Sequence, residues 1–166
     1  MIKHLFTRLV VLFATLWWSS SAYTNEHSLS ISLTLPTMDV SPYHRPYVAI
    51  WLESEQREYL STIAVWADDK EWYKDLRQWW RRAGRTKQDY DGVTSATRKP
   101  ATYLIRITSE TLHSYRQQYP TLLLNIEVVR EEGGRDFIRI PLTWPIENII
   151  HKGKKEVINI EITTEP

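Results

Sequence analysis

Residues 47–52 read Tyr-Val-Ala-Ile-Trp-Leu, an apolar run with no polar residue on either face of an extended chain. Such a run is typical of a strand in the middle of a sheet, where both faces are covered. The charged segment 53–58 follows, and then a second strand-like run, residues 59–66, reads Tyr-Leu-Ser-Thr-Ile-Ala-Val-Trp. This spacing predicts that the two strands pair as a hairpin.

Further strand patterns lie on both sides of this hairpin. They are short runs in which apolar residues alternate with polar ones or stand together between turn residues: 29–35, 102–108, 122–130, 137–142 and 158–162. About seven short strands with no alternation of strands and helices predict a mostly β fold, an antiparallel immunoglobulin-like β-sandwich. No Gly-x-Gly-x-x-Gly segment is present, which argues against a dinucleotide-binding α/β fold.

One inserted amphipathic helix is predicted over about residues 69–83. Asp68 is the expected N-cap, and Glu71 three residues later completes a capping box. The aromatic face is expected to be a lid over one end of the sandwich or, alternatively, a stacking surface for a flavin ring. Residues 109–120 fit either a short helix or a long polar loop. The apolar positions that share the face of the inserted helix are Trp72, Leu76, Trp79, Trp80 and Ala83.

The N-terminus has the pattern of a secretory signal peptide. Lys3 and Arg8 precede the apolar run 9–18, and the small residues 20–22 offer a cleavage site. The run is too short to span a bilayer by itself, although an uncleaved membrane anchor is the alternative. Cleavage after residue 22 leaves a single domain at 23–166 with 19 basic and 20 acidic residues. This charge balance gives no indication of nucleic-acid binding.

The chain contains no cysteine, which excludes disulfides, thiolate metal sites and iron–sulfur clusters. Redox work would therefore need a bound or attached organic cofactor. Neither a Ser-His-Asp arrangement nor a Gly-x-Ser-x-Gly elbow indicates a catalytic site. A metal-binding accessory role is the weakest possibility, because the histidines of the exported domain are not spaced as metal ligands: His27, His44, His113 and His151.

Residues 91–97 read Asp-Gly-Val-Thr-Ser-Ala-Thr and are expected on an exposed loop. They resemble the acceptor motif of bacterial flavin transferases, Asp-x-x-(Ser/Thr)-Gly-Ala-Thr. Those enzymes take FAD and join FMN through a phosphodiester to the last hydroxyl of the motif. The resemblance implies that Thr97 is the acceptor, that Asp91 and Thr94 are recognised, and that Ser95 and Ala96 form a small, permissive step. Ser95 stands where the family usually has glycine, so a left-handed backbone there would disfavour it.

Basic residues stand on both sides of this motif. They fit either a solvated surface or a functional role, in which Arg98 or Lys99 pairs with the phosphate of the attached FMN or docks an acidic partner. The set comprises Arg77, Arg81, Arg82, Arg85, Lys87, Arg98 and Lys99.

A wider resemblance covers nearly the whole exported chain. The blocks that carry it are residues 46–53, 64–67, 76–80, 91–100 and 133–144. They resemble an uncharacterised bacterial periplasmic family whose members tend to be encoded beside flavin transferases and PepSY-type membrane reductases. The resemblance implies a periplasmic electron carrier, rather than an enzyme, with FMN on Thr97 and those two proteins as partners. The alternative is a cofactor-free sandwich that binds a periplasmic or membrane partner.

Overall fold

The computed structural model describes residues 28–84 and 90–165. The predicted signal peptide at 1–22, His27, Arg85 and Lys87 lie outside the described residues, and the expectations about them stay predictions. Among the described residues, no helix is long and apolar enough to cross a membrane.

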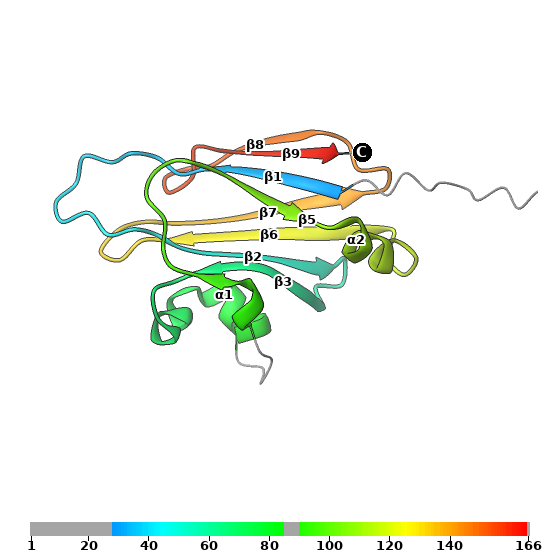
Figure 1. Cartoon of the computed structure of the whole chain (residues 1–166), viewed down its shortest axis with the longest axis horizontal. Coiled ribbons are helices and arrows are strands. Elements are labelled where there is room, and N and C mark those ends of the chain that lie inside the picture. Colours follow the sequence, from blue (N-terminus) through cyan, green and yellow to red (C-terminus); the bar gives the residue numbers. More distant parts are fainter. Residues whose placement is uncertain (1–27, 85–89, 166) are drawn as a thin grey trace, which may run out of the picture.

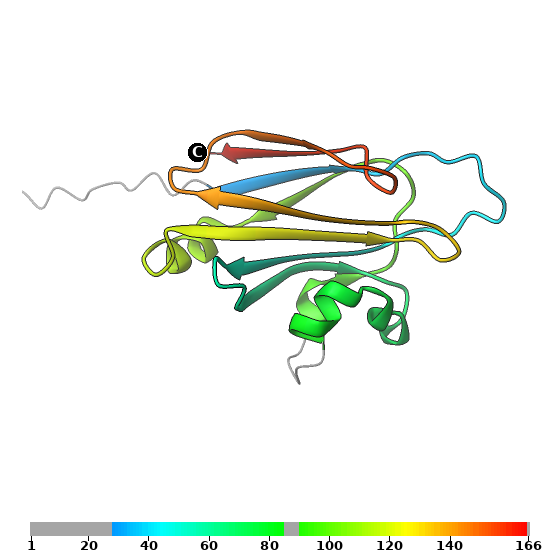
Figure 2. The same cartoon turned by 180° about the vertical axis from the view of Figure 1, so that it is seen from behind.

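Two β-sheets pack face to face (Figures 1 and 2). One sheet has the strand order β5-β1-β9-β8 and the other has the order β4-β3-β2-β6-β7. The mostly β, two-sheet prediction is confirmed, whereas the narrower immunoglobulin-like type stays a prediction. The strands are β1 (Ser28–Thr34), β2 (Tyr47–Ser54), β3 (Tyr59–Trp66), β4 (Thr94–Ser95), β5 (Thr102–Ile107), β6 (Thr121–Val129), β7 (Arg135–Thr143), β8 (Ile149–Lys152) and β9 (Asn159–Glu165).

Strand β2 lies in the middle of the larger sheet, between β3 and β6, and all of its residues are buried. Val48, Ile50 and Leu52 belong to the core between the sheets. Ala49 and Trp51 alternate with them and belong to a second apolar cluster. The continuous apolar run at 47–52 is explained by this burial on both faces, and its predicted hairpin with β3 is confirmed.

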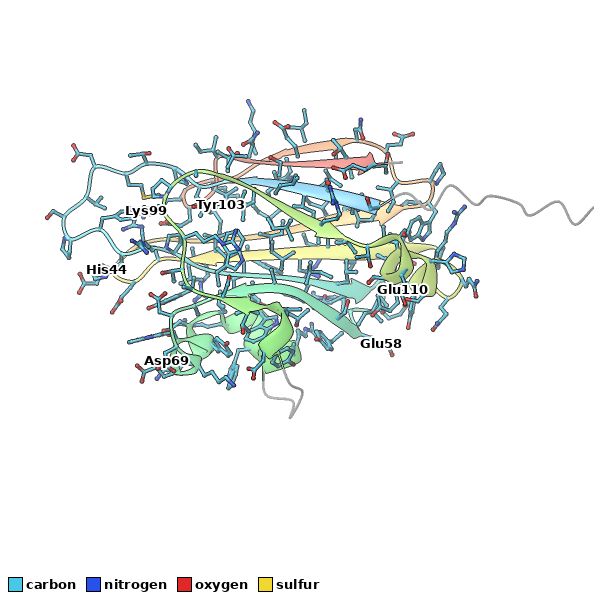
Figure 3. All side chains as sticks on the ribbon, in the orientation of Figure 1. His44, Glu58, Asp69, Lys99, Tyr103 and Glu110 are labelled. Carbon is cyan, nitrogen blue, oxygen red and sulfur yellow. The ribbon has the colours of Figure 1, made fainter. Side chains whose placement is uncertain are left out.

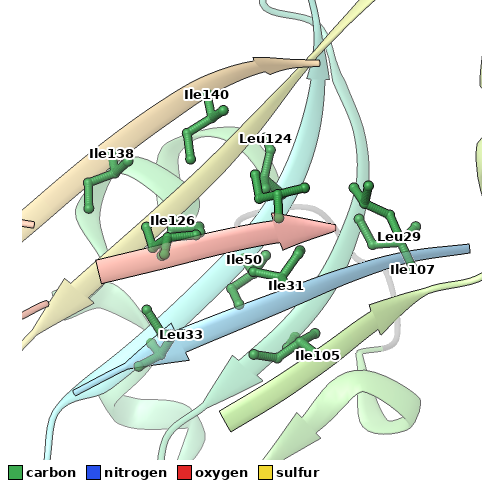
Figure 4. Close-up of a cluster of buried hydrophobic side chains, with 14 of the residues drawn as sticks. Leu29, Ile31, Leu33, Ile50, Ile105, Ile107, Leu124, Ile126, Ile138 and Ile140 are labelled. Atoms are coloured by element: carbon green, nitrogen blue, oxygen red, sulfur yellow. The ribbon is translucent and has the colours of Figure 1, made fainter. Parts of the chain in front are cut away.

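The core between the sheets consists of aliphatic side chains from both inner faces (Figure 4). Strand β1 supplies Leu29, Ile31 and Leu33, which are fully buried. Strand β6 supplies Leu124 and Ile126 from the opposite sheet, also fully buried. With no disulfide available, this alternating aliphatic core is the main source of stability.

The predicted continuous helix over residues 69–83 is wrong. The segment contains a 3-10 helix η1 (Lys70–Asp75), one α-helical turn α1 (Arg77–Trp79) and a π-helical turn η2 (Trp80–Gly84). Leu76 interrupts the helical path, with ψ at 69°. The interruption lets the next turn begin against a carboxylate of the sheet, because Glu127 of β6 accepts the backbone N–H groups of Gln78 and Trp79.

The predicted N-cap is also wrong, because Asp69 rather than Asp68 caps the first helical segment through the backbone N–H of Glu71. The aromatic segment covers the outer face of the larger sheet, as its cluster with Trp51 and Val65 shows, and not an end of the sandwich as predicted. A second helix, α2 (Ser109–Arg116), confirms the helical alternative for part of 109–120.

Two strands depart from the predicted pattern. Strand β8 lies in a stretch for which no strand was predicted, and it pairs with β9. Strand β4 pairs with β3 in parallel, so the described sandwich is not wholly antiparallel. The two-residue β4 is preceded by the short 3-10 turn η3 (Asp91–Val93). Both belong to the flavinylation-like segment, residues 91–97.

Candidate functional site

Residues 94–97 run alongside the end of β3. Thr94 and Ser95 form β4, whose register partners are Val65 and Trp66. The pairing continues one step further, because the backbone N–H of Ala67 donates to the carbonyl oxygen of Ser95 at 2.9 Å. Since β4 is an edge strand, the segment has a described partner strand on one side only.

Thr97, the predicted acceptor, is buried, with 6% of its surface exposed. Its hydroxyl donates to both carboxylate oxygens of Asp68, and both distances are 2.9 Å. Its backbone N–H donates to the Asp68 Oδ1 atom, also at 2.9 Å. One carboxylate therefore holds both donor groups of Thr97, and the expectation of a freely exposed acceptor is wrong for this conformation.

The predicted recognition residues lie nearer to solvent than the acceptor. The Asp91 carboxylate is exposed and lies 3.1 Å from the Lys70 ammonium group. An exposed pair of this kind contributes little to stability. The Thr94 hydroxyl donates to the Asp91 carbonyl oxygen at 3.4 Å, which closes the turn locally. The motif is thus divided into an accessible acidic turn and a buried threonine.

Ser95 and Ala96, between these two parts, are exposed. The described non-glycine residues with positive φ are Arg57 and Glu132, so Ser95 does not adopt the left-handed conformation. The steric reason for expecting glycine at this position therefore does not apply to the folded conformation. Two exposed residues with small side chains therefore lie at the end of β4 and just after it.

The described members of the predicted basic set lie in different parts of the fold. Arg98 places its guanidinium 4.1 Å from the ring centroid of Trp66 and 5.0 Å from that of Tyr103, a cation–π arrangement. Lys99 is exposed beside it. Arg82 faces the opposite end of β3, where its Nε atom lies 3.5 Å from the buried carboxylate of Glu53. Arg98 and Lys99 directly follow Thr97 in the sequence and are the members of this set to consider for pairing with a phosphate there.

A cavity of about 450 Å³ opens beside η1 and the turn between β6 and β7. The rings of Tyr47 and Trp72 stack there at 5.9 Å between centroids, and Arg77 and Arg135 also line it. Burial raises the pKa of the Tyr47 phenol to about 12. The negative charges of Glu131, Asp75 and Asp68 contribute smaller effects in the same direction. Asp68 therefore lies within electrostatic range of the cavity as well as in contact with Thr97.

These features belong to one end of the sandwich. Figure 3 shows Asp69, His44 and Lys99 toward this end, whereas Glu58 and Glu110 lie toward the other. The loops at this end therefore bring together residues 94–97 and the aromatic cavity. Among the described residues, no three side chains of metal-binding type gather closely enough to hold an ion.

Sequence reasoning missed the role of Asp68. Its neighbour Asp69 competes for the same helix-capping position, and adjacent acidic residues do not reveal which of them caps. The partner of Asp68 is Thr97, 29 residues away. The only available signal was an acidic residue just after a buried strand, which is too common to identify a contact of this range.

Comparison with known proteins gives one family. The family model described as "Predicted periplasmic protein (DUF2271)" matches residues 28–159. No curated protein and no solved structure matches the chain. The match covers strands β1 to β8 and reaches only the first residue of β9, and it includes residues 91–97.

Proposed function

Because the chain belongs to the DUF2271 family of predicted periplasmic proteins, we propose that it is exported to the periplasm and carries FMN there. The FMN is joined through a phosphodiester to Thr97 by a flavin transferase that takes FAD. The carrier then relays electrons beside a PepSY-type membrane reductase. It is a carrier and not an enzyme by itself, because the attached flavin supplies the electron chemistry.

One observation carries the proposal: Thr94 and Ser95 of the flavinylation-like motif form a short edge strand, β4. Edge strands offer backbone groups to an incoming protein, which recognises an extended segment together with its alternate side chains. The exposed Asp91, Ser95 and Ala96 are accessible for such recognition. A covalent link to the edge also suits a sandwich whose core is filled with aliphatic side chains.

The roles of the motif residues follow from this arrangement. Asp91 and Thr94 form the turn that the transferase reads, and Ser95 and Ala96 form the small, permissive step that precedes the acceptor. Thr97 supplies the oxygen that becomes part of the phosphodiester. Lys99 is exposed two residues later and is suited to pairing with the phosphate charge.

Intact mass spectrometry tests the proposal. The full chain is co-expressed with a flavin transferase in a bacterial periplasm, and the exported protein is expected to gain the mass of one FMN less one water. The Thr97→Ala variant should lose this gain. Thr102→Ala is the matched control, because Thr102 is an exposed threonine outside the motif and should leave the mass gain intact. An unmodified wild-type protein beside a labelled positive control contradicts the proposal.

The second candidate function is a cofactor-free module that binds a periplasmic or membrane partner. The cavity with the stacked Tyr47–Trp72 pair favours it, because aromatic residues and arginines are enriched in binding surfaces. In that case Trp72→Ala should abolish binding to a defined membrane partner, whereas Thr97→Ala should leave binding unchanged. The opposite pattern favours the flavin carrier.

A further inference from the structure

The acceptor oxygen of Thr97 is already engaged in the folded protein. The hydroxyl and the backbone N–H both donate to Asp68, and little of the residue is exposed. Asp68 itself is exposed, whereas Thr97 is buried. Any phosphorus atom that approaches the Thr97 Oγ1 atom has to take the place of the Asp68 carboxylate.

Electrostatics opposes that approach as well. The donor of the FMN group is FAD, whose pyrophosphate is negatively charged, and a carboxylate in contact with the reacting oxygen repels it. The arrangement that stabilises unmodified Thr97 is therefore unsuited to the transfer reaction for both steric and electrostatic reasons.

We infer that Asp68 is a positioning residue that holds Thr97 in an unreactive position, and that residues 94–97 must separate from Asp68 before FMN can be transferred. This inference rests on the proposed function. A local opening is sufficient, because in the described part of the chain the segment is held by the two-residue pairing of β4, the hydrogen bond from Ala67 and the contact with Asp68. Short edge segments with few buried contacts are the parts of a protein that open at the lowest free energy.

The chemistry of the transfer also keeps Thr97 from returning to its original contact with Asp68. In the transfer, a bond forms between the Thr97 Oγ1 atom and the phosphorus of the FMN half of FAD. The bond from that phosphorus to the bridging oxygen breaks, AMP leaves, and the hydroxyl proton is lost to the transferase or to water. The product oxygen has no hydrogen to donate to Asp68, and the phosphodiester beside it carries a negative charge. The hydrogen bonds from the hydroxyl to Asp68 therefore cannot re-form in the modified protein, and the charge of the phosphodiester opposes the remaining one from the Thr97 N–H.

Single-turnover labelling with purified transferase and FAD tests the inference. The measured quantity is kcat/KM for the acceptor protein in wild type, Asp68→Asn and Asp68→Ala. We expect Asp68→Ala to label about tenfold faster or more, since loss of hydrogen bonds to a charged group changes an opening equilibrium by at least that factor. Asp68→Asn keeps an acceptor oxygen without the charge and should be intermediate. Asp69→Asn is the control, because Asp69 caps η1 without contacting Thr97, and its rate should equal that of wild type.

A slower Asp68→Asn variant would indicate that Asp68 acts as a base during transfer, and that result overturns the inference. Equal rates in all variants overturn it too. Hydrogen exchange of the Thr97 amide gives a readout that needs no flavin. It should be slow in wild type, faster in Asp68→Ala, and equally fast in the FMN-modified wild type. Absence of labelling in every variant contradicts the proposed function, whereas an unprotected Thr97 amide in unmodified wild type contradicts the contact with Asp68 itself.

Discussion

The backbone N–H of Trp79 donates to the Glu127 Oε2 atom at 3.1 Å, so that a carboxylate of strand β6 caps the turn that carries the central tryptophan. The N–H of Gln78 donates to the same oxygen at 2.9 Å, and Arg135 lies 3.1 Å from the other oxygen, Oε1. Glu127 and Trp79 are both fully buried. The buried charge thus joins the aromatic segment to the larger sheet.

Removal of this carboxylate should destabilise the fold. Glu127→Ala leaves two backbone donors without their acceptor and removes the ion-pair partner of Arg135, and we expect it to lower the free energy of unfolding by about 2–4 kcal/mol. Urea unfolding measures the loss. Glu161→Ala, at an exposed position of β9, is the control and should change stability by less than about 0.5 kcal/mol. A buried-site variant as stable as this control would contradict the assigned role.

Glu127 should also make the free energy of unfolding depend on pH. Burial raises the pKa of Glu127 above its ordinary value, despite the opposing effects of the Trp79 N–H and Arg135. The folded protein therefore holds this proton to a higher pH than the unfolded chain does. The stabilisation that arises from the raised pKa of Glu127 is fully present below about pH 4.3, the ordinary pKa of a glutamate. It is lost as the pH rises through the raised pKa of the folded protein. Urea unfolding over this range should show a decline in wild type that is smaller in Glu127→Gln. Parallel curves for the two proteins would refute the prediction.

A second buried polar contact fixes the indole of Trp79. Its Nε1–H donates to the Thr62 hydroxyl at 2.9 Å, and the Tyr59 hydroxyl bonds to the same oxygen atom. Thr62→Val keeps the shape of the side chain but removes the acceptor, so we expect a loss of about 1–3 kcal/mol. Thermal or urea unfolding measures it. Thr102→Val alters an exposed hydroxyl pair with Thr34 and should have little effect.

The loop between β8 and β9 depends on one aspartate. The buried Asp136 Oδ2 atom accepts four consecutive backbone N–H groups, those of residues 154–157, at 2.9–3.0 Å. Asp136→Ala leaves these donors without an acceptor and should cost about 3 kcal/mol or more in unfolding free energy. Asp39→Ala, in an exposed loop, is the matched control. Amide exchange in 154–157 should rise sharply in the first variant only, and unchanged exchange there would be inconsistent with the observed hydrogen bonds.

The Ser95→Gly variant should have opposite effects on the rate of FMN labelling and on the stability of β4. Ser95 is extended and pairs with Trp66, so glycine should weaken β4 by about 0.5–1 kcal/mol through its larger entropy in the open state. Glycine also restores the usual fifth position of the flavinylation motif. We therefore expect faster FMN labelling with slightly lower stability, measured by single-turnover mass spectrometry and urea unfolding. Slower labelling in this variant would mean that the transferase uses the serine hydroxyl.

Much of the sandwich could be predicted because its signals are local. The alternation at 29–35 indicates a strand with one buried face, and the continuous apolar run at 47–52 indicates a strand buried on both faces. In each case the residues of that one strand are enough for the prediction. The helix over residues 69–83 could not be predicted correctly, because its break at Leu76 depends on a carboxylate 49 residues away from Gln78. The helical spacing was real, but tertiary hydrogen bonds replaced the helical ones.

The candidate site divides in the same way. The amino-acid sequence alone determined which residues form the flavinylation-like motif and that they follow the aromatic segment. The tertiary structure alone decided that Thr97 is buried, because its donors meet a carboxylate, Asp68, that follows β3. The parallel pairing of β4 with β3 brings these residues together. Contacts between distant segments depend on how the sheets assemble, and no local pattern of residue types encodes them.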